Sequence, residues 1–342
     1  MYLDDDRTLR DLARGCGLLG AGGGGDTFVP LTMARRALAE HGPVEVVDPD
    51  DLPADGLVMP CGLVGSPVVA AERILSGDEG RELRAAVEAR FGYPVVALMP
   101  YSIGGGNGLV CATWAARLGL PLLDADAMGR TFPSLAQMAT GLGGVRATPA
   151  ILTDGRGNTV VLDAVDDVWA ERLARGIAAS MGGVCAVAVA CLTVRDARRC
   201  AILGSISGAV ARGAAADGLG RVLAEGRLGA IERRVVGGAI SVSATLDAGG
   251  RWIQLEAQSE ILLALEDGAV CAVVPDTLAL VDAISSAPLL VERLRDDQAV
   301  RLLVLEAAPV WRTPGGRALT GPARFALELA GIPGGESRDG GG

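Results

Sequence analysis

The chain has 342 residues, of which 41 are acidic and 31 are basic, so its formal net charge is −10. Every basic side chain is an arginine, which excludes a Schiff base to lysine and a P-loop lysine. An acidic chain with only 3% aromatic residues offers neither a basic groove nor stacking surfaces, which excludes nucleic acid as a partner.

The first half of the chain alternates between predicted helices and predicted strands. Helices are expected at 6–16, 29–41, 79–90, 109–118 and 128–140, and strands at 44–47, 57–64, 94–99 and 121–123. Ser66 and Pro67 are a typical cap and first residue of a further helix. This alternation predicts an α/β N-terminal domain with a mainly parallel sheet over residues 1–166.

The second half is richer in short β-type runs. A hairpin is expected at 151–161, a helix at 166–179, a strand at 184–194, and further strands at 239–246, 252–255, 269–274 and 301–305. These predict a β-rich α+β C-terminal domain over residues 167–330. Residues 331–342 are glycine-rich with little to bury, so we expect a disordered tail.

Cysteine usage and hydropathy indicate the compartment. The seven cysteines are scattered without a C-x-x-C pair, as is typical of a reducing environment. The uncharged stretch 176–194 is interrupted by Gly182 and Gly183 and fits a buried strand better than a membrane span. We therefore expect a cytoplasmic protein with no membrane partner, and the sequence leaves a homo-oligomer open.

Polar residues gather after the predicted strands of the first half, at the edge where open parallel sheets bind ligands. The candidates for binding a small molecule are Gly22, Gly23, Gly24, Gly25, Thr27, Ser66, Ser102, Gly105, Asn107 and Arg130, and the candidate proton carriers are Asp26, Asp124 and Asp126. Each segment also has a plain structural interpretation. The glycine run fits a turn capped by Asp26, the 102–107 segment fits a strand-to-helix turn, and Asp126 fits a helix cap paired with Arg130.

Several segments together resemble one family. They are GAGGGGDT (20–27), VGSPVV (64–69), IGGGN (103–107), LLDADAMGRTFPSL (122–135), SEILLAL (259–265), VVPDTLALVD (273–282) and GPARFALEL (321–329). In this order they resemble the DUF917 family, whose named activity is S-methyl thiohydantoin desulfurase, from about residue 8 to 330. The sequence has Ser102 where the family usually has glutamate and Ser259 where it usually has asparagine.

The resemblance implies hydrolytic removal of a methylthio group from a C=N carbon of a small nitrogen heterocycle. That chemistry needs a base for water, an acid for the ring nitrogen or sulfur, and donors for the ring oxygens. Asp124 and Asp126 are the predicted base and acid, the glycine-run amides and Asn107 the donors, and Glu260 and Asp276 close the site from the second domain. No cofactor is required; if a metal binds, carboxylate ligands favour Mg²⁺ or Mn²⁺.

Two other functions stay open at this point. One is a non-catalytic binding or accessory subunit of a hydantoinase-type system. The other is a cyclase or isomerase of specialised metabolism that uses the same pocket. All three require the glycine run and the acidic side chains to meet around one ligand.

Overall fold

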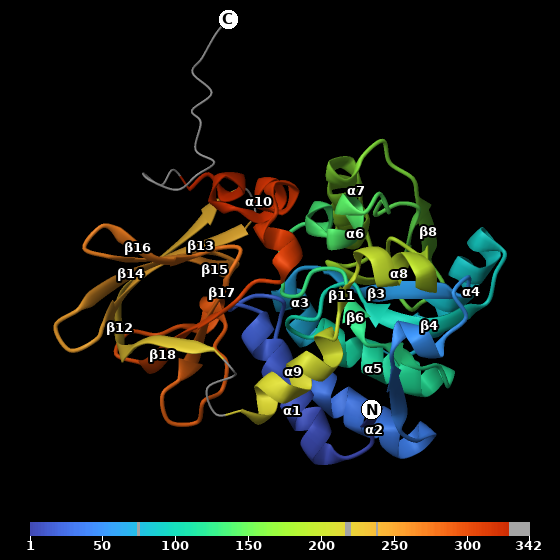
Figure 1. The fold of residues 1–342 in the computed structure, drawn as a ribbon, viewed down its shortest axis with the longest axis horizontal. Helices are drawn as coiled ribbons and strands as arrows, with labels where there is room; N and C mark the ends of the chain where they lie inside the picture. Colours follow the sequence, from blue (N-terminus) through green and yellow to red (C-terminus); the bar gives the residue numbers. More distant parts are fainter. Residues whose placement is uncertain (74–75, 216–219, 237–238, 328–342) are drawn as a thin grey trace, which may run out of the picture.

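The computed structural model describes residues 1–73, 76–215, 220–236 and 239–327 and shows two bodies side by side (Figure 1). One body is α/β, and the other is built almost wholly of antiparallel strands. The predicted fold class, an α/β domain followed by a β-rich domain, is confirmed. The tail predicted at residues 331–342 lies outside the described residues.

The sheet of the α/β body is mixed, with a parallel centre. Its order is β1 (Tyr2–Leu3), β2 (Val44–Val47), β5 (Leu122–Leu123), β4 (Val95–Pro100), β3 (Leu57–Gly65), β9 (Val184–Ala188), β7 (Ala150–Thr153) and β8 (Thr159–Leu162), with β10 (Leu192–Thr193) paired to β3. The strands β2, β5, β4 and β3 run parallel, and the flanking pairs are antiparallel. Most residues of β3 and β4 are buried, as expected of strands covered on both faces.

Helices cover this sheet, and their starts follow local sequence signals. They are α1 (Asp6–Leu19), α2 (Phe28–His41), α3 (Pro67–Glu72), α4 (Glu79–Phe91), α5 (Asn107–Leu118), α6 (Ala139–Leu142), α7 (Asp167–Ser180), α8 (Val194–Cys200), α9 (Ser205–Ala214) and α10 (Pro314–Thr320). Asp5, Ser66 and Asp166 each accept the backbone N–H three residues further on. These side chains satisfy donors that the first helical turn leaves free.

The helix predicted at 128–140 is wrong. Within that range the structure has only the short 3-10 helix η2 (Leu135–Gln137) and the start of α6. The Asp126 carboxylate accepts N–H groups from Met128 and Gly129, and Gly129 has a φ of +72°. These bonds hold the chain in a turn that cannot continue as a helix.

The antiparallel body is one curled sheet. Its order is β16 (Ala269–Val273), β15 (Glu260–Glu266), β14 (Trp252–Gln258), β13 (Ala239–Asp247), β12 (Arg221–Val236), β18 (Ala299–Leu305) and β17 (Thr277–Asp282). Along β14, Ile253 and Leu255 are buried while Trp252 and Gln254 are exposed, the alternation of a sheet with one covered face. The short elements are η1 (Pro49–Asp51), η3 (Val291–Arg293), η4 (Pro309–Arg312), η5 (Pro322–Phe325) and the β6 (Ala125–Asp126)–β11 (Ile202–Leu203) pair.

The change of sheet does not coincide with residue 166, where the sequence prediction ended the first domain. The strands β9 and β10 and the helices α7, α8 and α9 belong to the α/β body, and the second sheet begins at β12. The chain also returns: α10 lies against the α/β body near α6 (Figure 1), and Gln137 donates to the Leu319 carbonyl. The pairing of β9 with β3 is a long-range contact, so no local sequence pattern predicts that β9 belongs to the first sheet.

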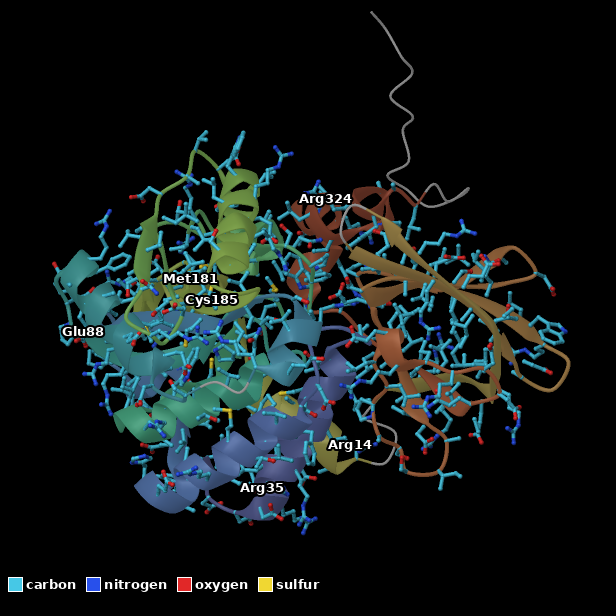
Figure 2. All side chains as sticks on the ribbon, turned by 180° about the vertical axis from the view of Figure 1, so that it is seen from behind. Arg14, Arg35, Glu88, Met181, Cys185 and Arg324 are labelled. Atoms are coloured by element: carbon cyan, nitrogen blue, oxygen red, sulfur yellow. The ribbon has the colours of Figure 1, made fainter. Side chains whose placement is uncertain are left out.

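Backbone hydrogen bonds join the two bodies at the glycine run. The Ile261 N–H donates to the Ala21 carbonyl at 2.8 Å, and the Val291 N–H donates to the Gly22 carbonyl at 2.9 Å. Beside them Arg14, labelled in Figure 2 near the junction, donates to the Ser286 carbonyl. These contacts fix the segment of residues 20–27 against the start of β15. Among the described residues, no helix has the length and apolar character needed to cross a membrane.

Candidate functional site

A cavity of about 390 Å³ lies where the two bodies meet. The α/β body contributes the glycine run, the start of α2, the end of β3 and the loop after β4. The antiparallel body contributes Ser259, Glu260 and Arg293. The wall therefore combines residues more than 200 positions apart in the chain.

Two glycine-rich loops form one side of the cavity by packing directly on each other. The Gly106 N–H donates to the Gly24 carbonyl at 3.0 Å. A Cβ at Gly105 would overlap that same carbonyl group, and both Gly24 and Gly105 have positive φ. Only glycine allows this approach without strain. The loop contact places the amides of Gly24 and Gly25 and the side chains of Ser102 and Asn107 around the cavity.

Glu260, the first residue of β15, places a carboxyl group at the cavity wall. Its side chain is 3% exposed, and its Oε2 has no hydrogen-bond partner in the described residues. Burial raises the pKa of Glu260 to about 8, against the opposing influence of Arg130 and Arg175. A Cβ at Gly23 would lie 2.5 Å from Glu260 Oε1, so the glycine run also makes room for this carboxyl. At neutral pH Glu260 is mostly protonated and can give or take a proton.

Arg130 lies behind the wall and carries the nearest buried positive charge. Its side chain is 2% exposed, lies over the Phe132 ring at 4.9 Å, and donates to the Asp276 carbonyl at 2.7 Å. Nη2 has no partner in the described residues, and burial lowers the pKa of Arg130 to about 10. A buried guanidinium with a free donor stabilises a carboxylate at Glu260.

Four neutral polar side chains complete the polar wall. The Ser102 hydroxyl donates to the Arg130 carbonyl at 3.2 Å, and the Tyr101 hydroxyl donates to the Leu63 carbonyl at 2.6 Å. Asn107 Oδ1 accepts the Leu63 N–H, and its side chain also hydrogen-bonds the Tyr101 hydroxyl, which leaves one N–H of the amide nitrogen to offer to a ligand. Thr131 Oγ1 is buried without a partner in the described residues. Buried polar atoms without partners at a cavity are typical of a ligand site.

Comparison with known proteins finds family models that match most of the chain. The N-terminal domain model described as S-Me-THD-like matches residues 7–164, and the corresponding C-terminal domain model matches residues 165–333. The chain belongs to the S-Me-THD-like family. A crystal structure of a protein from Chromobacterium violaceum has a similar fold, with a TM-score of 0.77 and 21% sequence identity over 95% of this chain and 96% of that one. None of the curated proteins gives a significant match.

The resemblance to the S-methyl thiohydantoin desulfurase family is thus confirmed. Most of the predicted site residues of this S-Me-THD-like chain lie in the cavity wall or behind it. The cavity is lined by Gly24, Gly25, Asp26, Ser66, Ser102, Asn107 and Glu260. The wall is supported from behind by Gly22, Gly23, Thr27, Gly105, Arg130 and Asp276, through the contacts given above and the α2 start at Thr27. Asp26 forms an ion pair with Arg293 at 2.5 Å that spans the two bodies.

The predicted base and acid, Asp124 and Asp126, are not brought into the cavity. The Asp124 carboxylate accepts the N–H groups of Ile206 and Ser207 and so caps α9. Asp126 is 0% exposed and accepts N–H groups from Ile103, Met128 and Gly129, and burial raises its pKa to about 6. Their catalytic role stays a prediction that these contacts do not support; what they do here is hold a helix and a loop.

Other cavity residues of the S-Me-THD-like chain were missed by the sequence analysis. They are Tyr101, Thr131, Phe132, Arg73, Arg175 and Arg293. Tyr101 directly precedes Ser102 in the polar segment after β4, so its position in the sequence was a usable signal. Arg73 follows α3, Arg175 lies in α7 and Arg293 ends η3, and no local pattern in these segments separates a cavity residue from a surface one.

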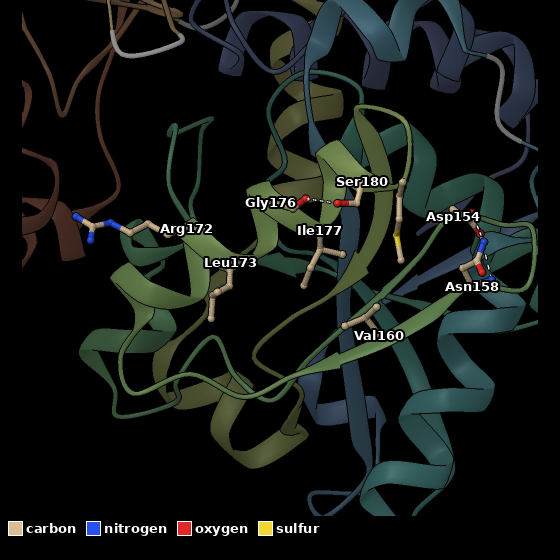
Figure 3. Close-up of a pocket in the computed structure, with 9 residues that line it drawn as sticks. Asp154, Asn158, Val160, Arg172, Leu173, Gly176, Ile177 and Ser180 are labelled. Atoms are coloured by element: carbon tan, nitrogen blue, oxygen red, sulfur yellow. Dashed lines mark hydrogen bonds between the residues drawn. The ribbon is translucent and has the colours of Figure 1, made fainter.

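A second depression, of about 560 Å³, lies on the surface between α7 and the β7–β8 hairpin. Figure 3 shows Val160 and Ile177 in its middle, Asp154 and Asn158 at one end and Arg172 at the other. The Asp154 carboxylate already accepts bonds from Asn158 Nδ2 and two backbone N–H groups. No described residue around this groove has a buried polar atom without a hydrogen-bond partner, unlike the interdomain cavity.

A metal site of the usual kind is not assembled in the described part of the chain. No group of three or more His, Cys, Asp or Glu side chains there has a metal-binding arrangement. The carboxylates of Asp124 and Asp126 accept backbone N–H groups. Two carboxyl groups line the cavity. Glu260 is mostly protonated and Asp26 is paired with Arg293, so neither is a good ligand for a hard cation.

Proposed function

We propose that this protein is a hydrolase that adds water to the C=N carbon of a small nitrogen heterocycle and releases a methylthio group as methanethiol. The observation that carries the proposal is the Glu260 carboxyl, buried at the interdomain cavity with Oε2 unpartnered in the described residues and its pKa raised to about 8. Membership in the S-Me-THD-like family supports the choice of substrate class.

One carboxyl can carry every proton of this reaction. Protonated Glu260 gives its proton to the ring nitrogen as the water oxygen bonds to the ring carbon, and the resulting carboxylate takes a proton from that water. In the second step Glu260 protonates the departing sulfur as the C–S bond breaks. The hydroxyl proton returns to Glu260 as the C=O bond forms. The sum is heterocycle plus water giving the ring carbonyl and methanethiol.

The neighbouring groups stabilise the charged stages of this sequence. Arg130 lowers the pKa of Glu260 and so stabilises the carboxylate that forms during water attack. The Thr131 hydroxyl and the Asn107 amide nitrogen can donate to ring oxygens, and the amides of Gly24 and Gly25 lie at the same wall. Because the cavity lies between two packed bodies, these donors are held in place before the substrate binds.

The test is turnover of an S-methyl thiohydantoin by the wild-type protein and by Glu260→Gln. Methanethiol is measured in the headspace and the hydantoin by chromatography, because the seven cysteines of the chain would react with a colorimetric thiol reagent. We expect equal amounts of both products from the wild type and a rate at least about a hundredfold lower from Glu260→Gln. Glu225→Gln, at an exposed position on β12, is the matched control.

Two outcomes contradict the proposal. One is the absence of methanethiol from the folded wild-type protein with any ring substituent. The other is a Glu260→Gln variant that keeps the wild-type rate. Tight binding of hydantoin by a wild-type protein that turns nothing over would instead support a non-catalytic binding subunit that uses the same cavity.

A further inference from the structure

The helix α7 buries small side chains and exposes large apolar ones. Ala170, Ala174 and Ala178 form its buried face. Trp169, on the opposite face, is 46% exposed. The other exposed large apolar side chains on α7, on β8 and between them are Val161, Val165, Val168 and Leu173. An amphipathic helix ordinarily turns its large apolar side chains toward the core. The reversed arrangement and the close grouping of these side chains indicate a surface that another body covers.

The outer face of α7 divides into a large half and a small half. Trp169, Leu173, Gly176 and Ser180 follow one another at intervals of three or four residues, so they lie along one side of the helix. The two large residues come first. At Gly176 an added Cβ would meet no described atom within 4 Å, and the groove of about 560 Å³ lies beside this small half (Figure 3). One helix therefore carries both a projecting tryptophan and a hollow.

Charged residues at the two ends of this outer face have opposite signs. Asp163 and Asp166, at the N-terminal end of α7, are exposed. Arg156 is exposed at the turn of the β7–β8 hairpin. Figure 3 shows Asp154 of that turn at the Ser180 end of the groove. Two copies of α7 that run in opposite directions therefore bring the acidic end of each beside the basic end of the other.

We propose that two copies of this chain associate through the outer faces of their α7 helices, which run in opposite directions about a two-fold axis. Trp169 of each copy then lies on Gly176 and in the groove of the other, and the acidic end of each helix faces Arg156 of the other. Both copies use the same surface, as a closed two-fold dimer requires. Arg172 lies over the Trp169 ring at 5.3 Å, and tryptophan and arginine are enriched at the centres of protein interfaces.

The oligomeric state of the full chain, measured by sedimentation equilibrium over a range of concentrations, tests this dimer independently of the proposed function. We expect the wild type to be a dimer with a dissociation constant in the micromolar range or below. Trp169→Glu should raise that constant at least about thirtyfold, because it removes the projecting ring and adds a charge to each contact. The matched control is Trp252→Glu, since Trp252 is 59% exposed on β14 of the other body and lies outside the proposed contact.

Gly176→Leu tests the hollow half of the contact without weakening the fold. Because this position has open space around it and leucine favours a helix more than glycine does, the variant should keep its far-UV circular dichroism and its cooperative thermal unfolding. The added side chain occupies the place of Trp169 from the second copy, so the dimer should be lost. Gly208→Leu on α9, another helical glycine with open space around it, is the control and should remain a dimer.

The outcomes separate a dimer through α7 from other arrangements. Loss of the dimer in Trp169→Glu and Gly176→Leu, while Trp252→Glu and Gly208→Leu stay dimeric, supports the proposal. A wild-type protein that stays monomeric up to about 100 μM overturns it and leaves the outer face of α7 to a partner of another kind. A dimer that Trp169→Glu and Gly176→Leu both leave intact also overturns it, because the contact then lies elsewhere on the molecule.

Discussion

Replacing Glu260 with glutamine is predicted to change how the free energy of unfolding depends on pH. The Glu260 carboxyl has a pKa of about 8 in the folded protein, against an ordinary value of 4.5. Below about pH 4.5 both states are protonated. As the pH rises from there to 8 and above, ionisation favours the unfolded chain, so this group lowers the stability of the wild type progressively. Glutamine cannot ionise and is free of this effect.

The expected size follows from the difference between the two pKa values. At about 1.4 kcal/mol for each pKa unit, full ionisation of Glu260 costs the folded state on the order of 5 kcal/mol. This free energy is comparable to the whole stability of many domains, so even a fraction of it is large enough to measure by denaturant unfolding. Denaturant unfolding at pH 5 and pH 9 should show the stability of Glu260→Gln, relative to wild type, rising by several kcal/mol between the two.

Glu225→Gln again serves as the control, because Glu225 is exposed on β12 and should follow the wild type at both pH values. Parallel pH dependences for wild type and Glu260→Gln would refute the reasoning. They would mean that the carboxyl is hydrated or paired in solution, and that its role as a proton carrier near neutral pH loses its physical basis.

The remaining predictions concern the loops, the aspartates and metal ions. Gly105→Ala should lower stability by several kcal/mol and abolish ligand binding, because the added Cβ would overlap the Gly24 carbonyl at a residue with positive φ. Thermal melts test this, with Gly229→Ala as the control because Gly229 has open space around it. Asp124→Ala should cost about 1 kcal/mol by uncapping α9 while leaving KM unchanged, as denaturant midpoints and kinetics will show. Treatment with EDTA should leave turnover unchanged, because the proposed steps pass through Glu260; loss of activity restored by Mg²⁺ or Mn²⁺ would argue for a metal.

The parts of the fold that depend on local signals could be predicted from the sequence. Asp166 before an apolar helical pattern predicts the start of α7, and Ser66-Pro67 predicts the start of α3, because a cap acts within its own turn. The strands β2 and β3 were predicted to within a residue, since mainly apolar segments of this length have few alternatives when Gly or Pro lies at their ends.

The misses have a common cause in long-range contacts. The helix predicted at 128–140 had suitable spacing, but Asp126 captures the N–H groups of Met128 and Gly129, and Trp311 donates to the Met128 carbonyl from 183 positions away. The strand β9 joins the first sheet by pairing with β3, although more than 100 residues separate the two strands in the chain. Neither interaction can be predicted from a short segment of sequence, because the partners lie far apart in the chain.

In the candidate site, too, the sequence predicted some residues correctly and missed what depends on long-range contacts. The sequence analysis placed the glycine run, Asn107 and Glu260 around one ligand, and the structure brings these residues to one cavity. It gave the proton transfers to Asp124 and Asp126, because two carboxylates near an arginine have the right chemistry. A carboxylate accepts backbone N–H groups or faces a cavity according to where the surrounding loops lie. Residue types and their spacing do not predict the positions of those loops.

A crystal structure with bound hydantoin, the product of the proposed reaction, tests the central claim most directly. The ring should occupy the interdomain cavity, with a ring nitrogen or oxygen within hydrogen-bond distance of the Glu260 carboxyl and with Thr131 or Asn107 on a ring oxygen. A ring bound in the groove between α7 and the β7–β8 hairpin, or one in the cavity that leaves Glu260 without a contact, would contradict the account.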